Sequence, residues 1–154
     1  MKIWRGLGVV LALWPVLAWA AGQGSPFLGV WHWNKADSKT PPGEPPPAAM
    51  DLVFERADAL HVRWTVTLTD ATGRKTADTY DVPANGEFYP IDADTSAAFT
   101  LGSDSLKAVF RGPGGETDTM TCRLANAGAR LVCTGEIASP DGNKADYVDV
   151  YDRG

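Results

Sequence analysis

The stretch Leu60-His-Val-Arg-Trp-Thr-Val-Thr-Leu-Thr69 decides the fold class of this sequence. Apolar and polar residues alternate over all of its positions, beginning with apolar Leu60 and ending with polar Thr69. Successive side chains of a β-strand point to opposite faces, so a period of two predicts a strand with one dry face and one wet face.

Shorter stretches with the same alternation follow along the chain, at residues 50–54, 97–101, 106–110, 120–124 and 131–137. Clusters of Gly, Asn, Asp and Pro lie between them and are typical of tight turns. Eight or nine short strands without a helical run favour an antiparallel sandwich or barrel.

Length and charge restrict the classes of function. The chain has 154 residues and a formal net charge of −5, which suits one domain with a real core. An acidic chain of this kind is a poor candidate for binding nucleic acid through phosphate contacts, and we expect no nucleic-acid partner.

The N-terminus has the layout of a cleavable secretory signal. Lys2 and Arg5 precede an apolar run over residues 7–17, and Ala18-Trp-Ala20 ends it. That run is shorter than the ~20 residues of a membrane-spanning helix. We therefore expect a signal peptide at 1–20, no stable membrane anchor, and a periplasmic or secreted mature domain at 21–154. Loss of the two basic residues lowers the net charge from −5 to −7.

The two cysteines, Cys122 and Cys133, flank a turn signal at 126–129. If the flanking strands form a hairpin about this turn, Cys122 faces Cys133 and Met120 faces Gly135. Directly opposed strand residues can be bridged by a disulfide, and an exported chain meets an oxidising environment. We expect a structural Cys122–Cys133 disulfide rather than a redox couple, because the C-x-x-C spacing is missing.

Several short motifs carry a resemblance to a known group of proteins. They are Phe27-Leu-Gly-Val-Trp-His-Trp-Asn34, then Asp37-Ser-Lys39 with a Pro/Gly-rich stretch at 40–47, and later Tyr89-Pro90, Ser139-Pro-Asp-Gly142 and Val150-Tyr-Asp-Arg153. In these motifs the chain resembles small exported bacterial proteins with lipocalin-like (calycin-type) barrels, a group whose function is uncharacterised. The resemblance implies an all-β, antiparallel, up-and-down barrel of eight to nine strands. By analogy with such barrels it also implies that Trp31 closes the barrel base under Arg153.

The alternating strands place a set of apolar side chains on the inward face, and we expect no charged residue among them. The set is Leu52, Phe54, Val62, Trp64, Val66, Leu68, Phe99, Leu101, Leu106, Phe110, Met120, Leu124, Leu131 and Ile137. A small barrel is wide enough either to be filled by such side chains or to hold one small ligand. Any such ligand is expected to be apolar.

Residues suited to catalysis or metal binding form no set in the sequence. His32 and His61 alternate with apolar positions and are expected on the outer surface, without partners nearby in the sequence. Asp146, Asp149 and Asp152 of the last strand are expected to be solvated edge charges rather than an acid/base pair. We therefore expect no enzyme, no metal and no cofactor.

Two classes of function remain. The first is an exported, non-enzymatic barrel that binds a small hydrophobic molecule, with Phe54, Trp64, Phe99 and Phe110 as the lining and the proline-rich loop at the mouth. An internal cavity of ~300 Å³ or more is the observation that would distinguish it from the alternative. The alternative is a protein-binding module, or an inhibitor of an exported enzyme, that acts through loops such as 40–47 or 111–117.

Overall fold

A computed structural model describes residues 24–154; the expected signal peptide at 1–20 lies outside them. The described chain contains a short 3-10 turn at Asn126–Gly128 and these strands: β1 Gly29–Trp33, β2 Ala49–Ala57, β3 His61–Thr69, β4 Lys75–Pro83, β5 Tyr89–Pro90, β6 Ser96–Leu101, β7 Ser105–Arg111, β8 Thr117–Ala125, β9 Arg130–Ala138 and β10 Lys144–Arg153. Over residues 24–154, none of the structure is a helix long and apolar enough to cross a bilayer.

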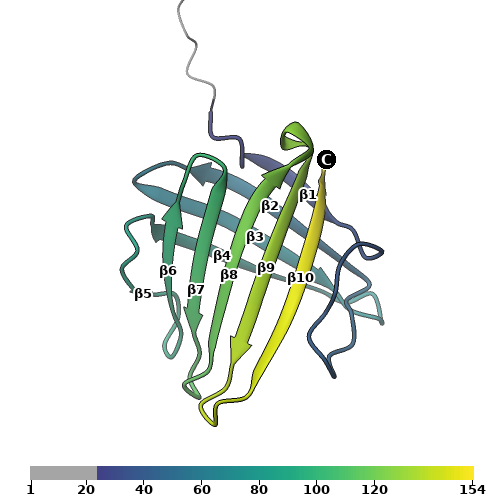
Figure 1. The fold of residues 1–154 in the computed structure, drawn as a ribbon, viewed down its shortest axis with the longest axis vertical. Helices are drawn as coiled ribbons and strands as arrows, with labels where there is room; N and C mark the ends of the chain where they lie inside the picture. The colour runs from purple at the N-terminus through teal and green to yellow at the C-terminus, as the bar shows by residue number, and fades with distance from the viewer. Residues whose placement is uncertain (1–23) are drawn as a thin grey trace, which may run out of the picture.

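The strands form one antiparallel sheet in the order β4-β3-β2-β1-β10-β9-β8-β7-β6-β5. In Figure 1, β6 to β10 lie side by side, and β1 to β4 cross behind them, so the sheet wraps around a single interior. Its two edges are β4 and β5. The chain just after β4 pairs with β6, where the Gly86 N–H donates to the Phe99 carbonyl at 2.8 Å. The result is a nearly closed up-and-down barrel.

The expected number of eight to nine strands is wrong, because the described chain has ten. The two strands that are hardest to see in the sequence are β4 and β5. Most positions of β4 are polar and exposed, and β5 is only two residues long, so neither shows the alternation of a half-buried strand.

The stretch that predicted the fold forms β3, from His61 to Thr69. Val62 and Trp64 are buried as expected, whereas Leu60 precedes the strand and is 70% exposed, and Leu68 lies exposed at the rim. A side chain at either end of a barrel strand lies beyond the packed layer, so the alternation continues there without burial.

The hairpin of β8 and β9 has the expected register. Cys122 pairs with Cys133 and Met120 with Gly135, and the two cysteines form a disulfide. Both cysteine side chains are fully buried on the inward face. The disulfide prediction is confirmed.

The base of the barrel is closed by two fully buried aromatic side chains, Phe27 and Trp31. The Trp31 indole N–H donates to the Phe27 carbonyl at 2.8 Å. The Arg153 guanidinium lies 4.1 Å from the Trp31 ring centroid and donates to the carbonyls of Pro26, Leu28 and Gly128. This arrangement ties the segment before β1 to the end of β10.

The segment after β1 continues along the edge of β10 with which β1 pairs. The Asn34 N–H donates to the Val150 carbonyl, and Lys39 exchanges two backbone hydrogen bonds with Val148. The Ser38 hydroxyl accepts from the Val150 N–H at 2.9 Å. These contacts direct the proline-rich loop, residues 40–47, toward the barrel mouth opposite Trp31.

Candidate functional site

The interior of the barrel contains a pocket of about 170 Å³, which we call the interior pocket. Its lining comes from β2, β3, β4, β7, β8 and β10 and comprises Met50, Leu52, Phe54, Trp64, Val66, Tyr80, Phe110, Asp118, Met120, Cys122, Asp149 and Tyr151. By itself it is smaller than the ~300 Å³ typical of small-molecule sites, because large aromatic side chains fill much of the barrel.

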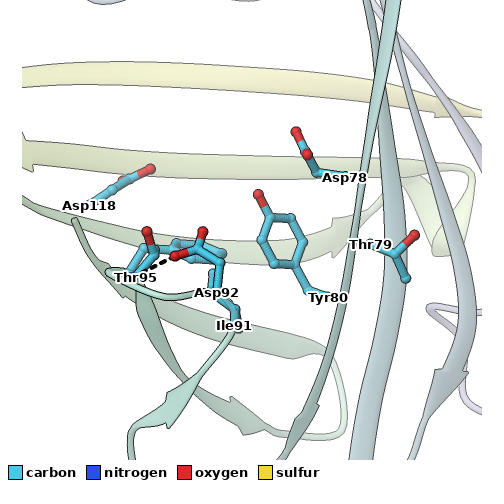
Figure 2. A pocket seen from close by; sticks show the side chains of 8 residues that line it. Asp78, Thr79, Tyr80, Ile91, Asp92, Thr95 and Asp118 are labelled. Carbon is cyan, nitrogen blue, oxygen red and sulfur yellow. Dashed lines mark hydrogen bonds between the residues drawn. The ribbon is translucent and has the colours of Figure 1, made fainter. Parts of the chain in front are cut away.

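Two further pockets share lining residues with the interior pocket. The gap pocket, about 530 Å³, lies where β4 and β5 leave the barrel open, and it shares Tyr80, Phe110 and Asp118 with the interior pocket. Figure 2 shows Asp78, Asp92 and Asp118 around the Tyr80 ring in this pocket. The mouth pocket, about 310 Å³, lies under the proline-rich loop and shares Asp118 and Asp149. The interior pocket therefore adjoins another pocket on two sides, at the gap and at the mouth.

The aromatic wall of the interior pocket is centred on Trp64. The Phe54 ring lies edge-on at 5.2 Å between centroids, and Tyr80 lies at 5.7 Å. Of the four expected lining residues, Phe54, Trp64 and Phe110 line the pocket. Phe99 instead stacks on Trp64 at 4.7 Å and is fully buried. Phe99 therefore packs against the Trp64 ring, and only Trp64 of the two lines the interior pocket.

A carboxylate, Asp118, lies at the junction of the three pockets. The Tyr147 hydroxyl donates to it, with the oxygens 2.8 and 3.0 Å apart. Burial raises the pKa of the Asp118 carboxyl, while the Tyr147 hydrogen bond opposes this effect. The expectation that no charged residue faces inward is wrong. Asp118 lies two and four positions before Met120 and Cys122 in β8, so its side chain points to the same, inward face. This spacing was the signal in the sequence that Asp118 faces the interior.

Tyr147 reaches Asp118 because Gly135 lies between them. Tyr147 of β10 is paired with Gly135 of β9, and Gly135 is paired with Met120 of β8. The Tyr147 ring fills the place that a Cβ atom at position 135 would occupy. A glycine inside a strand often marks such a close approach, and here it lets an aromatic ring extend across one strand to the next.

A second inward carboxylate, Asp149, accepts a hydrogen bond from the Trp33 indole N–H at 2.8 Å. Burial raises the pKa of Asp149, and the nearby charge of Asp118 adds to the effect. The expectation that Asp149 is a solvated edge charge is therefore wrong. Asp146 and Asp152 share one parity of β10, whereas Asp149 shares the inward parity of Tyr147 and Tyr151.

The two histidines lie on the outer surface, as expected, but each has a partner across the sheet. His32 Nδ1 lies 2.7 Å from an Asp51 carboxylate oxygen, and His61 Nδ1 lies 2.8 Å from one of Asp81. These partners are cross-strand neighbours that are distant in the sequence. No group of three or more His, Cys, Asp or Glu side chains suited to a metal ion occurs within residues 24–154.

No family model matches the sequence, and no curated protein is found as a relative. Solved structures match over most of the chain. The wild-type fluorescent protein UnaG aligns with a TM-score of 0.54 and 18% identity, over 83% of this chain and 97% of that one. A variant of UnaG aligns with a TM-score of 0.57 and 17% identity, over 84% of this chain and 96% of that one. A redesigned β-barrel aligns with a TM-score of 0.53 and 13% identity, over 84% of this chain and 93% of that one.

These likenesses, together with the sheet order, show that the chain has the antiparallel, up-and-down β-barrel fold of these proteins. At these identities they concern the fold alone. The chemistry of the site has to be argued from its own residues, which are an aromatic wall, two inward carboxylates and openings on two sides.

The close approach at Gly135 predicts a specific loss of stability. Gly135→Ala places a methyl group against the Tyr147 ring and should destabilise the protein by roughly 1–3 kcal/mol, the usual cost of overpacking. Urea denaturation measures this loss. In a Tyr147→Ala background the same substitution should cost much less, because the obstructing ring is gone. Equal losses in both backgrounds would contradict the assignment.

The inward position of Asp118 predicts a pH effect on stability. Its folded-state pKa is raised by burial, so its contribution to stability is full below the unfolded pKa of about 4 and is lost as the pH rises through the folded pKa. Asp118→Asn removes this loss and still offers Tyr147 an acceptor. Its urea midpoint, relative to the parent, should therefore increase from pH 4 to pH 7.

The matched control for this measurement is Asp104→Asn, which removes the same charge from an exposed turn. Its midpoint relative to the parent should change less over the same pH range. A relative midpoint of Asp118→Asn that stays constant or falls would contradict the pH prediction.

Proposed function

We propose that this chain is an exported, non-enzymatic binding protein that holds a small ligand, largely apolar in its body, inside the barrel. The observation that carries the proposal is the interior pocket, whose apolar and aromatic lining remains open between the gap pocket and the mouth pocket. Ligand sites in proteins are commonly concave, mostly apolar and equipped with a few polar groups.

The aromatic wall supports this proposal in a second way. Trp64 is held from behind by Phe99 and from the side by Phe54, so its ring is fixed before any ligand arrives. A preformed surface loses little conformational entropy on binding. The pocket is small, and a ligand with one or two rings is the class of molecule that fits it together with the adjoining space.

Export is the second part of the proposal. The basic, apolar and small-residue layout of residues 1–20 supports it, and so does the buried Cys122–Cys133 disulfide, since disulfides persist mainly in oxidising compartments. The mature protein of this proposal comprises residues 21–154 and works in the periplasm or outside the cell.

Native mass spectrometry of the protein purified from its own host tests both parts. The expected result is a chain with the mass of residues 21–154, or close to it, that carries an additional small molecule released on denaturation. An unprocessed chain would contradict export. A processed chain without any retained ligand, even at high protein concentration, would count against the binding function.

A cavity-filling variant tests the location of the ligand. Val66 lines the interior pocket, so Val66→Phe should weaken binding of the neutral apolar probe N-phenyl-1-naphthylamine by at least about tenfold, about 1.4 kcal/mol. Probe fluorescence measures the affinity. Thr67→Phe is the matched control, because it adds the same ring on the opposite parity of β3. Equal effects of both variants would contradict a site inside the barrel.

A further inference from the structure

The polar groups among the residues that line the interior pocket are carboxylates and phenol hydroxyls. They are the carboxylate oxygens of Asp118 and Asp149 and the hydroxyl groups of Tyr80 and Tyr151. Tyr151 is only 3% exposed, and its hydroxyl has the thioether sulfur of Met50, 3.6 Å away, as its hydrogen-bond partner. A thioether is a weak acceptor, and the oxygen lone pairs remain available to a donor. An ionised carboxylate only accepts hydrogen bonds, whereas each hydroxyl can accept or donate, so acceptors predominate among the polar groups of the lining.

The two carboxylates have neutral partners. Asp118 is held by the Tyr147 hydroxyl, and Asp149 by the Trp33 indole N–H. Among residues 24–154, the linings of the interior, gap and mouth pockets include no Lys, Arg or His. Two neighbouring, partly buried carboxylates without a cation beside them cost free energy, and burial raises the pKa of each.

The two openings of the interior pocket are lined by acidic side chains, like the pocket itself. Asp78 and Asp92 line the gap pocket (Figure 2), and Glu44 of the proline-rich loop lines the mouth pocket. Some acidic side chains elsewhere on the barrel are instead paired with arginines, as in Arg63 with Glu55 and Asp81. An acidic cleft with low-dielectric walls raises the local concentration of cations and repels anions.

The walls of the pocket suit a cation as well as an apolar body. Trp64, Tyr80 and Phe110 present aromatic rings to the same space as the carboxylates. The face of an aromatic ring attracts an ammonium group, and the attraction grows when water is excluded. An anionic ligand such as a carboxylate-headed lipid would find no cationic side chain in this lining and would lie beside two carboxylates.

We propose that the ligand of this barrel is an apolar amine, protonated at neutral pH. Its ammonium head lies between Asp118 and Asp149, and its apolar body packs on Trp64 and Phe110. An ammonium group has three donors and no acceptor, which matches the acceptors of the pocket. This inference rests on the proposed binding function and adds the charge and head group of the ligand.

Three phenylalkyl compounds of similar length and with different heads test the inference. They are 4-phenylbutylamine, 4-phenylbutanol and 4-phenylbutyrate, titrated into the purified protein at pH 7 and low salt by isothermal titration calorimetry. The amine should bind at least tenfold more tightly than the alcohol, and the butyrate more weakly than the alcohol. Added salt should reduce the advantage of the amine.

Variants assign that preference to the two carboxylates. The double variant Asp118→Asn/Asp149→Asn keeps the shape of both side chains and should reduce the affinity for the amine to that for the alcohol. Unchanged affinity for the alcohol shows that the pocket is still folded. The exposed Asp104→Asn variant changes the net charge and should retain the full preference for the amine.

The outcomes separate the inference from the function on which it rests. If the alcohol binds as tightly as the amine, or the butyrate binds best, the inference is overturned while binding in the barrel stands. If none of the three compounds binds, the binding function fails, and the inference fails with it. A preference for the amine that survives in the double variant would also overturn the proposed head-group site.

Discussion

The pairing of β1 with β10 is the contact on which the rest of the barrel depends. Within residues 24–154, every other pair of strands joins neighbours along the chain, whereas this pair joins the run β1 to β4 to the run β5 to β10. Its register places Trp31 opposite Arg153. The guanidinium then binds the Trp31 ring and three carbonyl groups, so the two halves are joined where the base is closed.

Because the barrel is joined at β1 and β10, its opening lies on the far side, between β4 and β5. Only the end nearer the base is drawn together there, through Asn85 and Gly86 against β6. The remaining opening is lined by Asp78 and Asp92 as well as by Tyr80, Ile91 and Phe110. The molecule therefore combines a closed, apolar base with an acidic, open side, and the interior pocket lies between them.

The sequence predicted the parts of the fold that follow local rules. The alternation in β3 and the turn between Cys122 and Cys133 were sufficient to predict strand direction, hairpin register and the disulfide. The outward positions of His32 and His61 followed from the same rule. Their partners, Asp51 and Asp81, did not, because a carboxylate that lies far off in the sequence becomes a neighbour only through the register of the sheet.

The candidate site was predicted only in part, because the alternation was followed through apolar residues alone. It identified Phe54, Trp64 and Phe110 as lining residues, but it ended at Met120 in β8 and so omitted Asp118 at the next inward position. Near the mouth of a barrel an inward side chain is only half-buried, so a carboxylate there is tolerated. Parity, extended to the end of each strand, would have placed Asp118 and Asp149 correctly. The separation between Phe99 and the pocket could not be predicted, since it depends on how Trp64 stacks.

Because the Tyr147 ring occupies the space beside Gly135, the side-chain volumes at these two positions depend on each other. A ring on β10 uses space that β9 leaves empty, and its hydroxyl holds the Asp118 carboxylate. Moving that volume from one strand to the other, with a larger side chain at 135 and a smaller one at 147, would conserve the packing while releasing Asp118 from its donor. An engineer could in this way alter the polar end of the interior without changing either carboxylate or the aromatic wall.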